Sequence, residues 1–227
     1  MGGCRAALIA VAVAAVATPA AAGTVSGKLD LPPRPARGVA DPKGFLERIE
    51  NPYKPAGDVP VAPFLVVVLD GEAKPSAPPQ VTWELAGESF LHPVIAAPAG
   101  AEISIKNTSK TARMLAAVED GKLIPPGPIN PGGPKSFRVT EVGKIYSVHD
   151  SEAPHLRGTI VVVATPFIAY VDDAGHFELP DVAPGDYKAR VFYKDAWLDV
   201  EQAVTVPTKG KVDVTLKVLA FAPAAKK

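Results

Sequence analysis

Short segments in which apolar and polar residues alternate recur along the chain, with turn residues between them. In 24–31, for example, apolar Val25 and Leu29 alternate with polar Ser26 and Lys28, and such a period of two predicts a half-buried strand. Similar segments, or apolar β-branched runs, predict further strands at 64–69, 81–85, 101–106, 114–118, 136–140, 144–148, 159–164, 167–171, 177–179, 187–193 and 212–218. Many short strands separated by turns are typical of β-sandwiches. The pattern therefore predicts an all-β chain.

A change in strand spacing at Thr165-Pro166 divides the chain into two predicted sandwiches. The strands are widely spaced before this point and form a denser meander after it. We predict a first sandwich at 23–164 with a Pro-rich insertion at 32–63, a second, smaller sandwich at 165–219, and a frayed tail at 220–227. Within the insertion only 42–50 predicts a helix, because Pro42 suits a first helical turn.

The first 22 residues have the three parts of a secretory signal. Arg5 supplies the positive charge, 6–17 form an apolar stretch too short to span a bilayer, and Ala20-Ala21-Ala22 offers a small-residue cleavage site. The sequence therefore predicts a periplasmic or extracellular protein with no transmembrane segment in its mature part. The one cysteine, Cys4, lies inside this signal, so burial of apolar side chains has to stabilise the mature fold without disulfides.

Charge and motifs exclude several classes of function. The chain has 24 basic and 24 acidic residues, and removal of Arg5 leaves a net charge of about −1, which gives no general attraction to nucleic acid or anionic lipid. The sequence contains no G-x-S-x-G, H-E-x-x-H, C-x-x-C-H or P-loop motif. We therefore predict a protein that is not an enzyme.

The segment 174–187, AGHFELPDVAPGDY, resembles the G-x-F-x-(I/L)-x-x-V-x-P-G-x-Y signature of carboxypeptidase regulatory-like domains. Gly175 suits a hairpin turn, Phe177 and Leu179 suit a core, and Pro184-Gly185 suits the next tight turn. The resemblance implies a small Ig/transthyretin-like sandwich for the second domain. Because every signature residue has a structural role, it identifies a fold and says little about function.

Upstream, the segments 90–94, 103–107, 144–149 and 158–163 resemble the cupredoxin-like part of bacterial periplasmic proteins labelled methylamine-utilisation or plastocyanin-like. In that family a cupredoxin-like domain precedes a regulatory-like one, as it does here. The resemblance implies a cupredoxin-like Greek-key sandwich for the first domain. It also identifies 144–158, KIYSVHDSEAPHLRG, with the loop that carries copper ligands in that family.

A blue-copper site needs two imidazoles, one thiolate and a weak axial thioether. Carried over by the resemblance, the thiolate position aligns with Ser147, the first imidazole with Arg113 and the thioether with Leu156. The second imidazole is expected about three residues after the thiolate, where His149 and Asp150 stand, and His155 reaches that place only across a gap. The resemblance therefore implies a degenerate site without a bound cofactor.

Two functional hypotheses follow. The leading one is a non-catalytic, exported binding or scaffold module whose partner is a periplasmic or cell-surface protein or a glycan. The alternative is a periplasmic metal-binding or electron-transfer protein that holds copper in a remodelled site. The candidate ligands of that site are His149, His155 and His92, with Asp150 as a further candidate, because imidazole and carboxylate bind Cu(II) or Zn(II) without sulfur.

Three weaker candidates complete the set. Asp172-Asp173 with Asp181 suggests calcium, although the EF-hand spacing is absent and acidic turns have local hydrogen-bonding reasons. His176 is expected at the surface of a hairpin. Trp197 is a candidate for glycan stacking, whereas the other large aromatic residues alternate along strands and are expected in a core: Trp83, Tyr187 and Tyr193.

Overall fold

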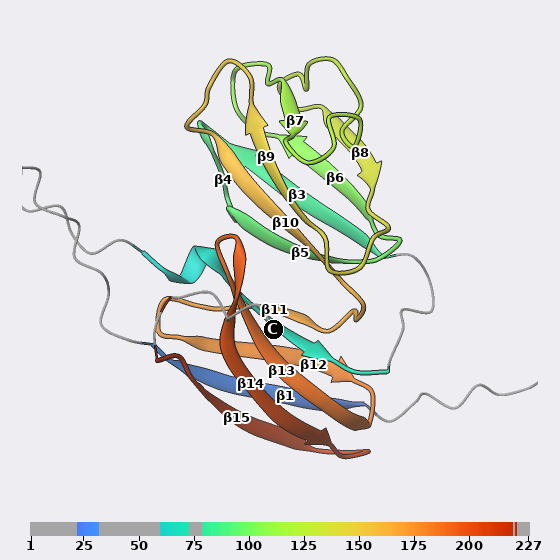
Figure 1. Ribbon diagram of the computed structural model, residues 1–227, viewed down its shortest axis with the longest axis vertical. Coiled ribbons are helices and arrows are strands. Elements are labelled where there is room, and N and C mark those ends of the chain that lie inside the picture. Colours follow the sequence, from blue (N-terminus) through green and yellow to red (C-terminus); the bar gives the residue numbers. More distant parts are fainter. Residues whose placement is uncertain (1–21, 32–59, 73–78, 220, 222–227) are drawn as a thin grey trace, which may run out of the picture.

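The computed structural model describes residues 22–31, 60–72, 79–219 and 221. Figure 1 shows these residues as two β-sandwiches that follow one another along the long axis of the molecule. A short 3-10 helix (Ala62–Phe64) precedes the second strand, and the other regular elements are strands. The predicted all-β class is confirmed. The predicted signal up to residue 21, the helix at 42–50 and most of the tail lie outside the described residues.

The first sandwich consists of two four-stranded sheets. One has the order β4 (Ser89–Phe90), β3 (Gln80–Ala86), β6 (Glu102–Asn107) and β8 (Pro134–Arg138); the other has the order β5 (Val94–Pro98), β10 (Arg157–Val163), β9 (Ile145–Asp150) and β7 (Leu115–Ala117). Each sheet contains one parallel pair, β3 with β6 and β5 with β10. Trp83 and the inward-facing residues of both sheets fill one core.

The second sandwich consists of a three-stranded and a four-stranded sheet. The first has the order β12 (His176–Val182), β1 (Gly23–Asp30) and β15 (Lys211–Lys217); the second has the order β11 (Ile168–Tyr170), β2 (Leu65–Asp70), β13 (Gly185–Tyr193) and β14 (Ala196–Val206). Its core includes Tyr187 and Tyr193, as predicted. Phe221 also packs here, 4.7 Å from Tyr193 between ring centroids, so this residue of the predicted tail is held.

Strand pairing corrects the predicted division of the chain. We predicted 23–164 as the first sandwich, but β1 pairs with β12 and β15, and β2 lies between β11 and β13. The second sandwich is therefore built from 23–30, 65–70 and 168–217, and the first lies between β2 and β11 in the chain. Alternation along a strand shows that one of its faces is buried, but it does not identify the partner strand.

Two strands of five or more residues, β5 and β14, were not predicted from the sequence, and the reasons are opposite. β5, Val-Ile-Ala-Ala-Pro, is buried at every position, so no alternation marks it. β14 lies at the edge of its sheet and has long exposed stretches, which weaken the alternation of apolar and polar residues. Burial on both faces and exposure at an edge both remove the period of two.

A third apolar cluster joins the two sandwiches. It combines residues of β5 and β10 with residues of β2 and β13, all at most 3% exposed: Val94, Ala96, Val161, Val163, Val66, Val68 and Phe192. These strands therefore bury one face in their own sandwich and the other in this contact, hereafter the seam. A dry apolar contact of this kind fixes the orientation of two domains, unlike the polar interfaces that permit domain motion.

An aromatic pair extends the seam at its margin. His92, between β4 and β5, stacks on Tyr170 of β11 with ring centroids 4.7 Å apart. Tyr170 is 39% exposed overall, yet burial of its hydroxyl end raises its pKa to about 12, against a smaller opposing effect of the Ala96 backbone. A group this hard to ionise stays neutral over the physiological pH range, so the seam gains no charge there.

Close packing around Gly158 sets the geometry of the first core. Trp83 and Phe90 stack with ring centroids 3.9 Å apart, and the Trp83 Nε1–H donates to the His92 carbonyl oxygen at 2.7 Å. A Cβ atom at Gly158 would lie 2.3 Å from the Trp83 ring and 2.8 Å from that of Phe90. Only glycine lets β10 approach this stacked pair.

We predict that Gly158→Ala lowers the free energy of unfolding by about 2 kcal/mol, because the added methyl group overpacks the Trp83–Phe90 pair. Gly121→Ala is the matched control, since a Cβ at Gly121 meets nothing within 4 Å. Urea unfolding followed by tryptophan fluorescence measures both. Equal stability of the two variants would show that the ring pair can move aside without cost.

Candidate functional site

The end of the first sandwich holds the residues that the sequence analysis aligned with copper ligands. Asn107, the last residue of β6, is fully buried and shapes the loop that follows. Its Nδ2 donates to the carbonyl oxygens of Thr111 and Ile129 at 2.8 and 2.7 Å, and its Oδ1 accepts from the Ser109 backbone N–H at 2.9 Å. A fully bonded buried amide gives the loop one conformation.

The loop after β6 places Arg113 at the end of the first sandwich. Its backbone forms a bridge with Ile129, and the residue is only 9% exposed. The guanidinium Nη2 donates to the Gly87 carbonyl oxygen at 3.3 Å and lies 3.9 Å from a Glu88 carboxylate oxygen. Its Nη1 lies 4.0 Å from Oδ2 of Asp150. A permanent positive charge is thus fixed at this position.

Asp150 supplies the opposite charge and organises the loop on its own side. It is the last residue of β9 and is 1% exposed. Its Oδ1 accepts from the backbone N–H groups of Glu152 and Ala153 at 2.8 and 3.2 Å, and its own N–H donates to the Leu156 carbonyl oxygen at 3.2 Å. The same carboxylate therefore folds the loop and faces Arg113.

The contact between the two charges is electrostatic rather than a hydrogen bond. At 4.0 Å the Nη1 to Oδ2 distance is too long for one, and neither Oδ2 of Asp150 nor Nε of Arg113 has a hydrogen-bond partner among the described residues. Opposite charges at this separation attract strongly when water is excluded. Removing either one would leave the other buried without compensation.

The structure corrects the alignment of the thiolate position with Ser147. Tyr146 and Val148 face the core, so Ser147 and His149 lie on the opposite face of β9. The Ser147 backbone N–H and Oγ–H both donate to the Glu119 carboxylate, at 2.6 and 2.8 Å. The side chain at the end of β9 that faces Arg113 is Asp150.

With Asp150 at that position, the expected second imidazole position moves to Ala153, whereas the thioether position stays at Leu156. Ala153 comes three residues later and is 7% exposed, and Leu156 is fully buried. The four positions then hold a guanidinium, a carboxylate, a methyl group and an isobutyl group: Arg113, Asp150, Ala153 and Leu156. One oxygen ligand beside a fixed cation does not fit copper, which requires imidazole and sulfur donors here.

The three candidate histidines lie in three different surroundings. The ring of His92 stacks on Tyr170, and Nε2 of His155 lies 3.4 Å from a Glu88 carboxylate oxygen in an exposed loop. His149 lines a cavity between the sandwiches, and its buried Nδ1 has no hydrogen-bond partner among the described residues. Within the described ranges, no three His, Cys, Asp or Glu side chains group as a metal site.

The acidic turn proposed for calcium has a local explanation. Asp172 accepts from the backbone N–H groups of Ala174 and His176 at 2.9 and 2.7 Å, and lies 3.6 Å from the His176 imidazole. The hydrogen bond from the His176 backbone N–H, more than that from Ala174, holds the pKa of Asp172 below its ordinary value. Asp181 stands in the left-handed region with φ of 56°. His176 is exposed, as predicted.

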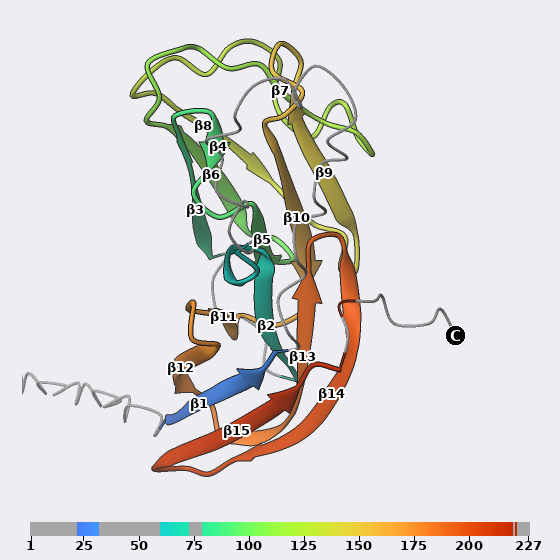
Figure 2. The same cartoon turned by 90° about the vertical axis from the view of Figure 1, so that its left-hand side faces the viewer.

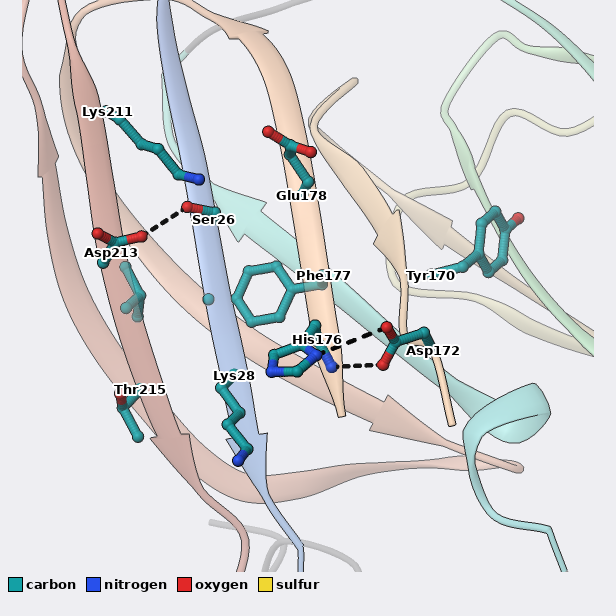
Figure 3. Close-up of a pocket in the computed structure, with 12 residues that line it drawn as sticks. Ser26, Lys28, Tyr170, Asp172, His176, Phe177, Glu178, Lys211, Asp213 and Thr215 are labelled. Carbon is teal, nitrogen blue, oxygen red and sulfur yellow. Dashed lines mark hydrogen bonds and ion pairs between the residues drawn. The ribbon is translucent and has the colours of Figure 1, made fainter. Parts of the chain in front are cut away.

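The other candidates also have partners. Trp197 is half-buried: the Arg190 guanidinium lies 4.1 Å from its ring centroid, and Phe192 packs against it edge-on at 5.2 Å. One face of the Trp197 ring, the predicted platform for glycan stacking, is therefore covered. A cavity of about 530 Å³ lies on the outer face of β12, β1 and β15, and the Ser26 hydroxyl donates to Asp213 there at 2.7 Å. Figure 3 shows this pair and the contact of His176 with Asp172. Four of the cavity's polar groups are thus engaged in pairs.

Comparisons with known proteins add the following. No protein-family model and no curated protein matches the chain. Among solved structures it is similar to a purple cupredoxin from Nitrosopumilus maritimus, with 15% identity over 36% of this chain and 98% of that one, at a TM-score of 0.33. It is also similar to a reduced mutant of amicyanin, with 17% identity over 42% and 97% of the chains, at a TM-score of 0.34.

The fold class therefore rests on the strand order, and the site on this chain's own side chains. They define an all-β protein of two sandwiches in which a buried ion pair closes the end of the first. In the part of the chain that the structure describes, no helix has the length and apolar character needed to cross a membrane.

We predict that Ser147→Ala raises the pKa of Glu119 toward its ordinary value. Burial alone would raise this pKa, but the two bonds from Ser147, together with smaller effects of the Glu119 backbone and His149, outweigh burial, so the pKa of Glu119 in the folded protein lies below the unfolded value. The stabilisation is present above the unfolded pKa and is lost as the pH falls through the folded one. A carboxyl-carbon NMR titration measures the shift, with Thr205→Ala, whose hydroxyl bonds Asp186, as control. An unchanged Glu119 pKa in Ser147→Ala would contradict the prediction.

Proposed function

We propose that this chain is a non-catalytic, exported binding or scaffold module in which an ion pair closes the first sandwich without copper. The observation that carries the proposal is the contact between buried Arg113 and buried Asp150 at the end of the sandwich. The guanidinium joins the loop after β6 to the loop after β9. A metal bound by ligands from both loops would make the same connection.

The second sandwich supports the proposed regulatory-like domain through the positions of its signature residues. Phe177 and Leu179 are buried in the core. Gly175 has φ of 86°, and a Cβ there would lie 2.7 Å from the Leu29 carbonyl oxygen. The Tyr187 hydroxyl donates to the Ala183 carbonyl oxygen at 2.8 Å. Each signature residue thus has a structural role, which suits a scaffold and adds no reactive group.

One observation favours the alternative, a metal site made of histidines. Nδ1 of His149 is buried without a hydrogen-bond partner in the described part of the chain, and an imidazole nitrogen in that state is a potential ligand. Such a site would need His155 or His92 to join it. The neighbouring Arg157, opposite His149 across the β9–β10 pair, opposes a cation there.

The test is the copper content of the mature protein. After loading with Cu(II) and exhaustive dialysis, we expect less than one tenth of an equivalent of copper and no intense visible absorption, because none of the four positions held by Arg113, Asp150, Ala153 and Leu156 carries a sulfur or imidazole donor. Stoichiometric copper would overturn the proposal. If that copper is lost in His149→Ala/His155→Ala, the alternative of a histidine metal site replaces the proposed copper-free module.

A pair of gain-of-function variants tests which residues occupy the copper-ligand positions. The variant Arg113→His/Asp150→Cys/Ala153→His/Leu156→Met supplies the complete blue-copper ligand set, and we expect it to bind one copper with strong thiolate-to-copper absorption. The matched control carries Ser147→Cys and retains Asp150, with the other three changes identical. We expect this control to stay colourless, since residue 147 lies on the opposite face of β9. Colour in the control alone would refute the corrected alignment.

A further inference from the structure

A cavity of about 640 Å³ opens between the two sandwiches beside the seam. One wall comes from β9, β10 and the residues just before β5, and the other from Phe64 and the turn Lys194-Asp195 between β13 and β14. Figure 2 shows this turn lying beside β9 and β10. Small-molecule sites commonly occupy such junctions, with volumes of about 300–1,000 Å³.

Part of the lining is apolar. Phe64, Pro93 and Pro154 contribute ring faces, and Val94 continues the surface from the seam. Val118 is 66% exposed, although it lies directly after a strand whose two ends are buried. Together they offer a hydrophobic surface large enough for a flat ligand of one or two rings.

The polar groups at the rim are mostly cationic. Nε of Arg157 donates to the Pro154 carbonyl oxygen at 2.7 Å, and no hydrogen bond within the described ranges engages the two outer nitrogens of the guanidinium. Lys194 stands in a turn with φ of 56°, with Nζ 5.7 Å from the Phe64 ring centroid. Within the described residues neither cation forms an ion pair with a carboxylate, although Asp195 also lines the cavity.

The third polar group lies deeper. Nδ1 of His149 is buried and has no hydrogen-bond partner in the described ranges. Burial of such an atom without a partner costs free energy. Ser147, the neighbouring outward residue on β9, is already bonded to Glu119. His149 is therefore the polar group of the wall that needs a partner.

We propose that this cavity binds a small aromatic carboxylate. The carboxylate lies between Arg157 and Lys194, and the flat apolar body lies on Phe64 and the two prolines, within reach of His149. A guanidinium matches a carboxylate with two parallel hydrogen bonds, and a lysine adds a second charge. This inference rests on the proposal that the chain is a binding module, and it names the class of ligand.

The test uses 2-naphthoate as the probe and 2-naphthamide, its neutral isostere, as the matched ligand, with the mature protein labelled with ¹⁵N. We expect naphthoate to shift the amide signals of 147–149, 157–159 and 194–195, and to bind about tenfold more tightly than the amide, because only the anion makes charge-assisted bonds. Arg157→Gln and Lys194→Gln should each weaken naphthoate about fivefold while leaving naphthamide unchanged.

Lys28→Gln, a cation beside the outer cavity of Figure 3, is the control variant and should bind naphthoate normally. No shifts at millimolar naphthoate, shifts confined to other residues, or equal binding of acid and amide would each overturn the inference. The copper content of the same preparation is measured independently, so a failure of naphthoate binding does not alter the conclusion on copper. Copper retention would count against the proposed function and leave the naphthoate result to be judged by itself.

Discussion

The end of the first sandwich depends on one electrostatic constraint: a buried guanidinium needs a buried carboxylate close by. Arg113 lies in the loop from β6 to β7, and Asp150 ends β9, the strand that pairs with β7. Arg113 also donates to the Gly87 carbonyl oxygen in the turn between β3 and β4 of the opposite sheet, and Asp150 holds the loop after β9 through two backbone N–H groups. Their attraction therefore couples local loop conformations across the sandwich. The fixed positive charge also disfavours a metal cation beside Asp150, and in the proposed function the ion pair takes the place of a metal here.

The seam holds the two sandwiches in a fixed arrangement, and this affects the cavity beside it. Because β2, β5, most of β10 and the last residues of β13 bury both faces, the two sandwiches are joined by core-like packing, with Phe192 fully buried between them. A cavity at the margin of such a contact keeps its shape in the absence of a ligand, and a pre-organised site avoids the entropic cost of ordering its walls. His149 belongs to this cavity, which explains why it faces away from Arg113 and Asp150.

The sequence supported the all-β class and most strands, because Val25, Leu29 and their counterparts alternate visibly. It could not assign β1 and β2 to the second sandwich, since pairing over more than a hundred residues leaves no local signal. It aligned Arg113 and Leu156 with the ligand positions, but placed the thiolate at Ser147 rather than Asp150. Asp150 is three positions after Ser147 along β9, and such an odd offset moves the side chain to the other face. The alternation of Tyr146, Val148 and Asp150 was the available signal, but a charged residue ending an inward-facing row does not suggest burial.

A double-mutant cycle between Arg113 and Asp150 tests most directly that this ion pair closes the sandwich. Arg113→Met removes the cation and keeps the length of the side chain, and Asp150→Asn removes the charge and keeps the oxygen that accepts from Glu152 and Ala153. Urea unfolding should show a loss of about 3 kcal/mol for each single variant, and a double variant about 2 kcal/mol more stable than their sum predicts. Strictly additive losses would contradict the account, because the two charges would then act independently.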